Sequence, residues 1–447
     1  MTTWLGVRAS LLCFVASGLL AQQSTNPDER IVGERGAAIA ALVRGMEAHG
    51  FCGAVLAARD GEIVAALGVG LADPATKRRN TARTLFEIAS ATKQFTAAAI
   101  LVLQQDGKLT LDDPIGKHLP AVPKHAQAVT VRHLLQHTSG FPPERTAGGQ
   151  DDLAKSVRAF LGEPPSHPPG ERFGYWNPGY ALLAGIVERA SGQSYVAFCQ
   201  RRLFVPAGMS AATFTGERAP AGVPVATGVE GPVSRPALGH PYRSYGFQYR
   251  GMGGAVCNVY DLWRWDRALA ADKVLTTASK ELLFRPGLEQ YALGWRVTEV
   301  PGRGVLQEHG GDVAGFHTAM RRHPDRGVFV VVLTNGSGAL RHEVADAVTA
   351  MLFDEPSPIV PAELAGRLVG AWRSERGDVL RVQANGPLLE ANLEWVAGQR
   401  TRGSLVGSDL ATLAWFEAGT GQRYPVTCGQ EGGSFVSLGF EGMTFRR

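Results

Sequence analysis

Cysteine is scarce in this chain, with five residues among 447. Their spacing matches no metal-binding arrangement, which excludes a metal centre built on cysteine ligands. Runs of basic residues are also missing, and 45 Lys and Arg are nearly balanced by 41 Asp and Glu. Since binding to a nucleic-acid backbone needs concentrated positive charge, we expect no nucleic-acid partner.

The N-terminal apolar run, Leu11 to Leu20, is too short to span a membrane comfortably. It follows Arg8 and leads to small residues near Ala21, which is the layout of a secretory signal peptide. Leu12 precedes Cys13 where a lipoprotein signal needs a small residue, so we expect no lipid or other membrane anchor. We therefore predict a signal peptide over residues 1–21 and export to the periplasm or the medium. A buried N-terminal helix is the alternative.

Removal of this segment leaves four cysteines that could pair in three ways: Cys52, Cys199, Cys257 and Cys428. Export permits disulfides. However, 45% of the residues are apolar and 19% charged, as in a globular protein with a large core. A chain of this kind does not need disulfides, so we expect buried free thiols.

Along the chain, the apolar patterns predict strands first, then helices, then strands again. Asp60-Gly61 joins two strand-like runs and predicts a hairpin, whereas residues 215–241 are rich in Gly and Pro and predict a surface excursion. Beyond the prolines at 356, 358 and 361, short alternating runs predict a small all-β domain. We expect domain limits of 34–355 and 362–447. Strands are predicted near 51–59, 62–70, 293–297, 304–308, 316–321 and 328–334, and helices near 36–48, 90–106, 177–191, 194–203, 259–271 and 340–353.

Ser90 and Lys93 stand three positions apart at the predicted start of a helix. Residues at this spacing share a helix face, so the hydroxyl and the amine can touch. A serine hydroxyl becomes a good nucleophile when a neighbouring base takes its proton, and a lysine amine can be that base. S-x-x-K also occurs by chance in many chains, so a purely structural reading stands beside the catalytic one.

Three further patterns follow this pair: His137-Thr138-Ser139-Gly140, Tyr175-Trp176-Asn177 and His309-Gly310-Gly311. Asn177 before Pro178 predicts a helix N-cap, which does not exclude a catalytic duty. By themselves, Tyr175 could be a core tyrosine and His309 an ordinary surface histidine.

Several motifs of other enzyme classes are missing. His133 and His137 are four apart but lack the glutamate of H-E-x-x-H, so we interpret them as structural and expect no metal. The glycines at 251–254 lack G-x-G-x-x-G spacing, so we expect no cofactor. Neither Ser139 nor Ser337 has a glycine two positions before it, which excludes the G-x-S-x-G motif of α/β-hydrolase esterases.

Taken together and in this order, the patterns resemble the penicillin-recognising serine hydrolases, in the branch that holds class C β-lactamases, DD-peptidases and related esterases. The resemblance covers about residues 34–353. It implies an α/β fold in which an antiparallel sheet is flanked by helices and carries an inserted all-helical region. It also implies that the C-terminal all-β domain is barrel-like, as in esterase and peptidase relatives.

The resemblance implies roles by position. Ser90 would attack a carbonyl and form an acyl-enzyme, while Lys93 and Tyr175 would carry its proton. Asn177 would orient Lys93 and the substrate amide. His309 would line the site from the third pattern.

In the same resemblance, the main-chain N–H groups of Ser90 and Asp312 would form an oxyanion hole beside Gly310 and Gly311. The third pattern departs from the family, because many members have Lys-Thr-Gly where this chain has His309-Gly310-Gly311. A mostly neutral histidine and a lost hydroxyl weaken a pocket for a substrate carboxylate.

We therefore expect poor turnover of penicillins and cephalosporins, and better turnover of small esters or peptide-like amides. The expected partner is a small or peptide-like substrate, with cell-wall fragments among the options. A true β-lactamase or DD-carboxypeptidase is one alternative. Another is a penicillin-binding sensor that stays acylated and does not turn over.

Overall fold

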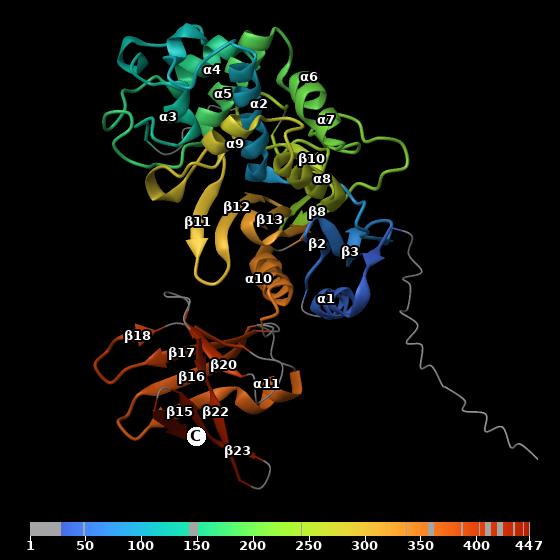
Figure 1. The fold of residues 1–447 in the computed structure, drawn as a ribbon, viewed down its shortest axis with the longest axis vertical. Coiled ribbons are helices and arrows are strands. Elements are labelled where there is room, and N and C mark those ends of the chain that lie inside the picture. Colours follow the sequence, from blue (N-terminus) through green and yellow to red (C-terminus); the bar gives the residue numbers. More distant parts are fainter. Residues whose placement is uncertain are drawn as a thin grey trace, which may run out of the picture.

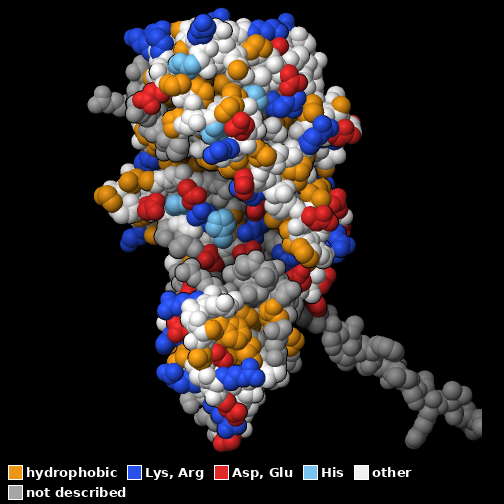
Figure 2. Space-filling view, turned by 90° about the vertical axis from the view of Figure 1, so that its left-hand side faces the viewer, with side chains coloured by type: hydrophobic (Ala, Val, Ile, Leu, Met, Phe, Trp, Pro, Cys, Tyr) orange, Lys and Arg blue, Asp and Glu red, His pale blue; other side chains and the backbone are white. Residues whose placement is uncertain are grey.

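The computed structural model describes twelve stretches of the chain: residues 28–47, 50–142, 151–242, 244–336, 338–355, 362–385, 388–401, 403–406, 413–417, 423–431, 434–440 and 442–446. The expected signal peptide, with Cys13, and the prolines at 356, 358 and 361 lie outside these residues. Within them, no helix has both the length and the apolar character needed to cross a membrane. Figure 2 shows acidic and basic side chains interspersed over one face.

A seven-stranded antiparallel sheet forms the centre of the larger part of the chain, in the order β1-β3-β2-β14-β13-β12-β11. The predicted hairpin is confirmed: Asp60 and Gly61 both have the positive φ that a tight two-residue turn requires. The strands are β1 (Arg30–Ile31), β2 (Gly53–Arg59), β3 (Glu62–Val69), β11 (Arg296–Val300), β12 (Gly304–Val313), β13 (Phe316–His323) and β14 (Val328–Thr334).

Both faces of this sheet are covered. In β14, Val330 and Val332 point into one core and Val331 and Leu333 into the other, because successive side chains of a strand alternate. Helices α1 (Gly33–Met46) and α10 (Arg341–Leu352) pack side by side on the first face (Figure 1). The second face packs against α8 (Val259–Ala270) and the helical region. The expected sheet flanked by helices is therefore confirmed.

Apart from α8, the helices between β3 and β11 form a lobe at one end of this sheet (Figure 1), and α2 packs against α5 in its interior. They are α2 (Lys93–Gln105), α3 (Val131–Leu135), α4 (Leu153–Phe160), α5 (Asn177–Ser191), α6 (Tyr195–Cys199), a π-helical turn (Gln200–Phe204), α7 (Val205–Ala207) and α9 (Thr277–Leu283). Thr130 caps α3, since its side chain accepts the His133 N–H.

Small sheets accompany the lobe. One orders β6 (Phe86–Glu87), β10 (Ala255–Cys257) and β7 (Thr213–Phe214), and another pairs β4 (Leu71–Asp73) with β5 (Arg78–Arg79). The prediction of an irregular excursion over 215–241 was wrong in part. This segment holds a hairpin, β8 (Thr227–Glu230) with β9 (Val233–Pro236). Its Arg235 pairs with the buried Glu87 at 2.5 Å, a long-range contact that no local pattern shows.

The C-terminal residues form a separate antiparallel sheet with its own core around Trp372, Leu405 and Phe445. The predicted sheet-rich character is confirmed, but the unit is not all-β, because helix α11 contributes Leu364 and Leu368 to its core. Among the described strands no pairing closes the sheet into a barrel. The elements are α11 (Ala362–Leu368), β15 (Gly370–Ser374), β16 (Val379–Asn385), β17 (Leu388–Glu394), β18 (Arg400–Thr401), β19 (Gly403–Val406), β20 (Ala414–Glu417), β21 (Arg423–Pro425), β22 (Thr427–Glu431), β23 (Ser434–Phe440) and β24 (Met443–Arg446).

The four cysteines of the described chain are free thiols, as expected. Cys199 and Cys257 are buried, and burial raises the pKa of both thiols. Cys52 and Cys428 are only partly buried, so the expectation of burial was right for two of the four.

Candidate active site

Ser90 lies in a tight turn between the sheet and the helical lobe. Residues Ala89–Thr92 form a 3₁₀ turn, and the α-helix α2 begins at Lys93, three residues later than predicted. Ala89 has a φ of +45°, a left-handed conformation that non-glycine residues rarely adopt. This conformation is compatible with a functional turn. Ser90 itself is partly exposed and can be reached by a substrate.

Lys93 is fully buried, and its ammonium group has three oxygen acceptors. Nζ lies 3.0 Å from Ser90 Oγ, 2.8 Å from Asn177 Oδ1 and 2.9 Å from the main-chain oxygen of Met252. The S-x-x-K spacing therefore brings the alcohol and the amine into contact. The other two acceptors come from 84 and 159 residues further along the chain.

Asn177 does not cap α5, so the N-cap prediction was wrong. Trp176 occupies the N-cap position, and no side chain caps the helix there. Asn177 is the first helical residue, and its amide oxygen accepts from Lys93. Pro178 follows it within the first turn, where a missing N–H costs nothing.

Tyr175 precedes α5 on the helical side of the site and is partly exposed. The centre of its ring is 4.9 Å from Lys93 Nζ, within the range of a cation–π contact. The ring of Tyr180 lies 5.5 Å from the same nitrogen. The structure thus gathers Ser90, Lys93, Tyr175 and Asn177 around one ammonium group.

His309 lies within β12 and is almost fully buried. Burial, together with the positive charge of Lys93, lowers the pKa of His309 to about 4. Its Nε2 lies 3.0 Å from the hydroxyl of Tyr291, and its Nδ1 lies 2.5 Å from the Gly310 oxygen. Tyr291 was missed in the sequence because a single tyrosine outside any motif gives no signal.

Gly311 brings β12 against the Ser90 turn. A Cβ at this position would stand 3.0 Å from Ser90 N and 2.2 Å from the Ile88 oxygen, so only glycine permits this approach. Gly310 is less crowded, since its Cβ would stand 3.3 Å from the Thr318 oxygen. The strand that carries the third pattern therefore runs directly beside the nucleophile.

Asp312 is exposed on β12, next to Gly311. Its carboxylate contacts His317 Nδ1 and Arg341 at 2.8 Å, and both partners lower its pKa. The expected role of Asp312 concerns its main-chain N–H, which these side-chain contacts leave untested.

The glycines at 251–254 have a packing role that the sequence did not reveal. Gly251 and Gly254 have φ values of +80° and +90°, and a Cβ on Gly253 would clash with the ring of Tyr249. This close packing holds the intervening Met252 oxygen where Lys93 donates to it. Met252 was missed because a main-chain acceptor has no side-chain signature.

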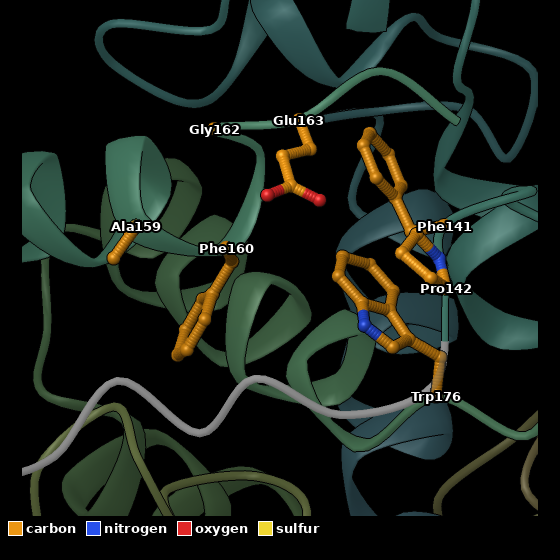
Figure 3. A pocket seen from close by; sticks show the side chains of 7 residues that line it. All are labelled: Phe141, Pro142, Ala159, Phe160, Gly162, Glu163 and Trp176. Carbon is orange, nitrogen blue, oxygen red and sulfur yellow. The ribbon is translucent and has the colours of Figure 1, made fainter. Parts of the chain in front are cut away.

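A cavity of about 250 Å³ lies beside the Tyr175 loop, lined in part by the stacked rings of Phe141 and Trp176. Figure 3 shows the Glu163 carboxylate directed into the space between Phe160 and Trp176. The cavity thus borders the residue that follows Tyr175, although Ser90 does not line it.

Comparison with known proteins identifies the family of this chain. The Beta-lactamase family model matches residues 38–353, and the chain belongs to this family of serine hydrolases, which also includes penicillin-binding proteins. The chain is 32% identical over 384 residues to a penicillin-binding protein of Bacillus subtilis, covering 75% of this chain and 82% of the relative.

Two solved structures show the same fold. The penicillin-binding protein of Bacillus halodurans has 28% identity and a TM-score of 0.58, covering 69% of this chain and 98% of its own. The octameric penicillin-binding protein homologue of Pyrococcus abyssi has 23% identity and a TM-score of 0.64, covering 93% and 100%. The predicted family is confirmed, and the second likeness concerns the fold alone.

Proposed function

We propose that the chain hydrolyses an ester or a peptide-like amide, of the esterase or D-amino-acid peptidase type, through an acyl-enzyme on Ser90, and that it turns over β-lactams poorly. The observation that carries this proposal is the contact of 3.0 Å between Nζ of the buried Lys93 and Ser90 Oγ. A base at this distance can take the serine proton as the hydroxyl attacks a carbonyl.

Lys93 can contact Asn177 and Met252 in either charge state. A charged ammonium has three N–H donors, and Ser90 Oγ, Asn177 Oδ1 and the Met252 oxygen lie within hydrogen-bond distance of it. A neutral amine keeps two N–H donors for Asn177 and Met252, and its lone pair then faces Ser90 Oγ. Proton transfer between serine and lysine therefore breaks no contact to the other two acceptors.

Tyr175 and Asn177 complete the proposed chemistry. Tyr175 would pass the serine proton to the leaving group and later take one from the attacking water. Asn177 would hold the lysine in place through its 2.8 Å contact and orient the substrate amide. These steps split hydrolysis into acylation and deacylation, each with a carbonyl that becomes an oxyanion.

The oxyanion would be held by the main-chain N–H groups of Ser90 and Asp312. Gly311 lets β12 approach the serine turn, so a carbonyl on Ser90 would lie between the turn and the strand. Removing one such donor typically lowers kcat by about a hundredfold or more.

The neutral imidazole of His309 supports the proposal of weak β-lactam turnover. His309, with a pKa of about 4, is neutral at pH 7 and offers no cation to a substrate carboxylate. A neutral ester or amide does not need such a cation.

A serine-directed phosphonate probe followed by peptide mapping tests the nucleophile. We expect label on Ser90 in the wild type and none in Ser90→Ala. Chromogenic esters, D-amino-acid amides and cephalosporins then define the substrate class. Labelling at another residue, or cephalosporin turnover as fast as that of the esters, would contradict the proposal. An acyl group that stays on Ser90 would indicate a sensor.

Export is a further part of the proposal, and it depends on the predicted signal peptide over residues 1–21. Sequencing the N-terminus of protein recovered outside the cytoplasm tests it. We expect the mature chain to begin shortly after Ala21. Full-length protein retained in the cytoplasm would refute it.

A further inference from the structure

His137 holds both neighbours of Tyr175. Its main-chain oxygen accepts the Gly174 N–H at 2.8 Å, and its Nδ1 accepts the Trp176 N–H at 3.0 Å. The two donors flank Tyr175 in the chain, so one residue fixes the backbone on either side of the phenol. His137 is itself 2% exposed and has a φ of +57°, which places its ring and its carbonyl on the same loop.

The ring of His137 also packs against the ring of Tyr175. Their centroids are 4.2 Å apart at an angle of 36°, and the rings of Tyr180 and Tyr291 lie 5.1 and 4.8 Å away. The imidazole is thus enclosed by the aromatic groups that surround Lys93. Backbone and side chain of Tyr175 are held by the same histidine.

The contact to Trp176 requires a neutral imidazole. Nδ1 can accept an N–H only when it carries no proton, so the ring proton must be on Nε2. Lys93 and His309 are the charged or titratable groups of α2 and β12 near this ring, beside the phenols of Tyr175, Tyr180 and Tyr291. Burial and the charge of Lys93 lower the pKa of His137 well below its ordinary value.

We propose that His137 is a positioning residue for Tyr175, acting through its Nδ1 acceptor and its ring, so that the phenol keeps its place beside Lys93. This inference rests on the proposed function, in which Tyr175 carries the proton. It gives the His137-Thr138-Ser139-Gly140 turn a task in catalysis other than metal binding or helix termination. His137 contacts no reacting atom and acts only through the Tyr175 loop.

A matched pair of variants tests the acceptor role of His137 Nδ1 separately from the size of the side chain. His137→Asn keeps an oxygen near the place of Nδ1, whereas His137→Gln moves its oxygen one bond further out, toward the place of Nε2. A reacting group misplaced by about 1 Å can lose about a hundredfold in rate. We expect His137→Gln to lower kcat on an ester substrate by roughly tenfold to a hundredfold, with KM changed less than about threefold, and His137→Asn to recover most of the rate.

A double-mutant cycle with Tyr175→Phe separates positioning from general destabilisation. If His137 acts through the phenol, His137→Gln costs little further rate once the phenol is gone. His323→Gln is the control, because His323 is equally buried but packs on Phe353, away from the site. We expect it to leave kcat unchanged. If His137→Gln does not fold, judged by near-ultraviolet circular dichroism, His137→Phe replaces it with the same expected results.

Two results would overturn the inference: a His137→Gln enzyme as fast as His137→Asn, or losses from His137→Gln and Tyr175→Phe that multiply. Its failure can be told from failure of the proposed function. If Ser90→Ala keeps full activity, the proposed function itself fails. If Ser90→Ala and Tyr175→Phe lose activity while His137→Gln does not, only the positioning role of His137 fails.

Discussion

Replacing Gly311 by alanine should separate β12 from the serine turn. The new Cβ would stand 2.2 Å from the Ile88 oxygen, and Cβ atoms do not approach backbone atoms closer than 3.0 Å. The difference, 3.0 minus 2.2 Å, requires a relative shift of 0.8 Å. Both the oxygen and the strand are main chain, so no flexible side chain can absorb this shift.

The expected loss follows from the size of that shift. Displacement by about 1 Å between a nucleophile and the groups that stabilise its oxyanion costs about a hundredfold in rate. Overpacking of this kind also destabilises a fold by about 1–3 kcal/mol. We therefore expect kcat/KM of Gly311→Ala on an ester to fall about a hundredfold while the protein remains folded.

Two variants control for the added methyl group. Gly310→Ala places its Cβ 3.3 Å from the Thr318 oxygen, so its loss of rate should be clearly smaller. Gly36→Ala in α1 places its Cβ 2.5 Å from the oxygen of Val64 in β3, so it should lower the melting temperature without lowering kcat. Steady-state kinetics and thermal unfolding measure both effects. Wild-type activity in a folded Gly311→Ala would refute the proposed approach of strand and nucleophile.

Three further predictions concern polar groups that contact buried charges or titratable side chains. Asn177→Leu removes an acceptor from Lys93, so kcat on an ester should fall at least tenfold and unfolding free energy by about 1–3 kcal/mol, measured by kinetics and urea titration. The pKa of His309 is about 4 when folded and about 6.5 when unfolded. The unfolded state therefore binds more protons between these values, and stability should rise with pH by up to about 3 kcal/mol across this window, then level off. His309→Gln should flatten this rise in melting temperature, and an unchanged slope would contradict it. Arg235→Met leaves the buried Glu87 carboxylate without its cation and should cost about 3–5 kcal/mol, whereas an unchanged urea midpoint would show the pair to be unimportant.

The sequence predicted the structure correctly where the deciding contact joins residues close together in the chain. Asp60-Gly61 predicts its hairpin because both residues tolerate positive φ. Ser90 and Lys93 meet because three positions make about one helical turn, and this remains true although the turn is 3₁₀ at first. The apolar runs likewise predicted β13 and β14, because burial on two faces leaves a clear pattern, whereas the exposed edge strand β11 begins three residues later than predicted.

Long-range contacts explain what the sequence did not predict. Asn177 before Pro178 has the form of a cap, yet its amide reaches Lys93, and Trp176 takes the cap position. The segment 215–241 lacks periodicity, yet it forms a hairpin held by Arg235 to Glu87. In each case the deciding partner lies far away in the chain and becomes visible only when the fold is assembled.

The same reasoning shows how the candidate site achieves its arrangement. The contact between Lys93 and Ser90 is local, because both residues belong to one turn. The other two acceptors of Lys93 come from α5 and from the glycine-rich bend at Met252. A buried amine is tolerated only when its donors are satisfied, so these distant segments stabilise the lysine in its place. Among these acceptors, Ser90 is partly exposed and carries the hydroxyl that can react as a nucleophile. The contacts that satisfy the buried Lys93 amine thus also hold it as a proton acceptor beside Ser90.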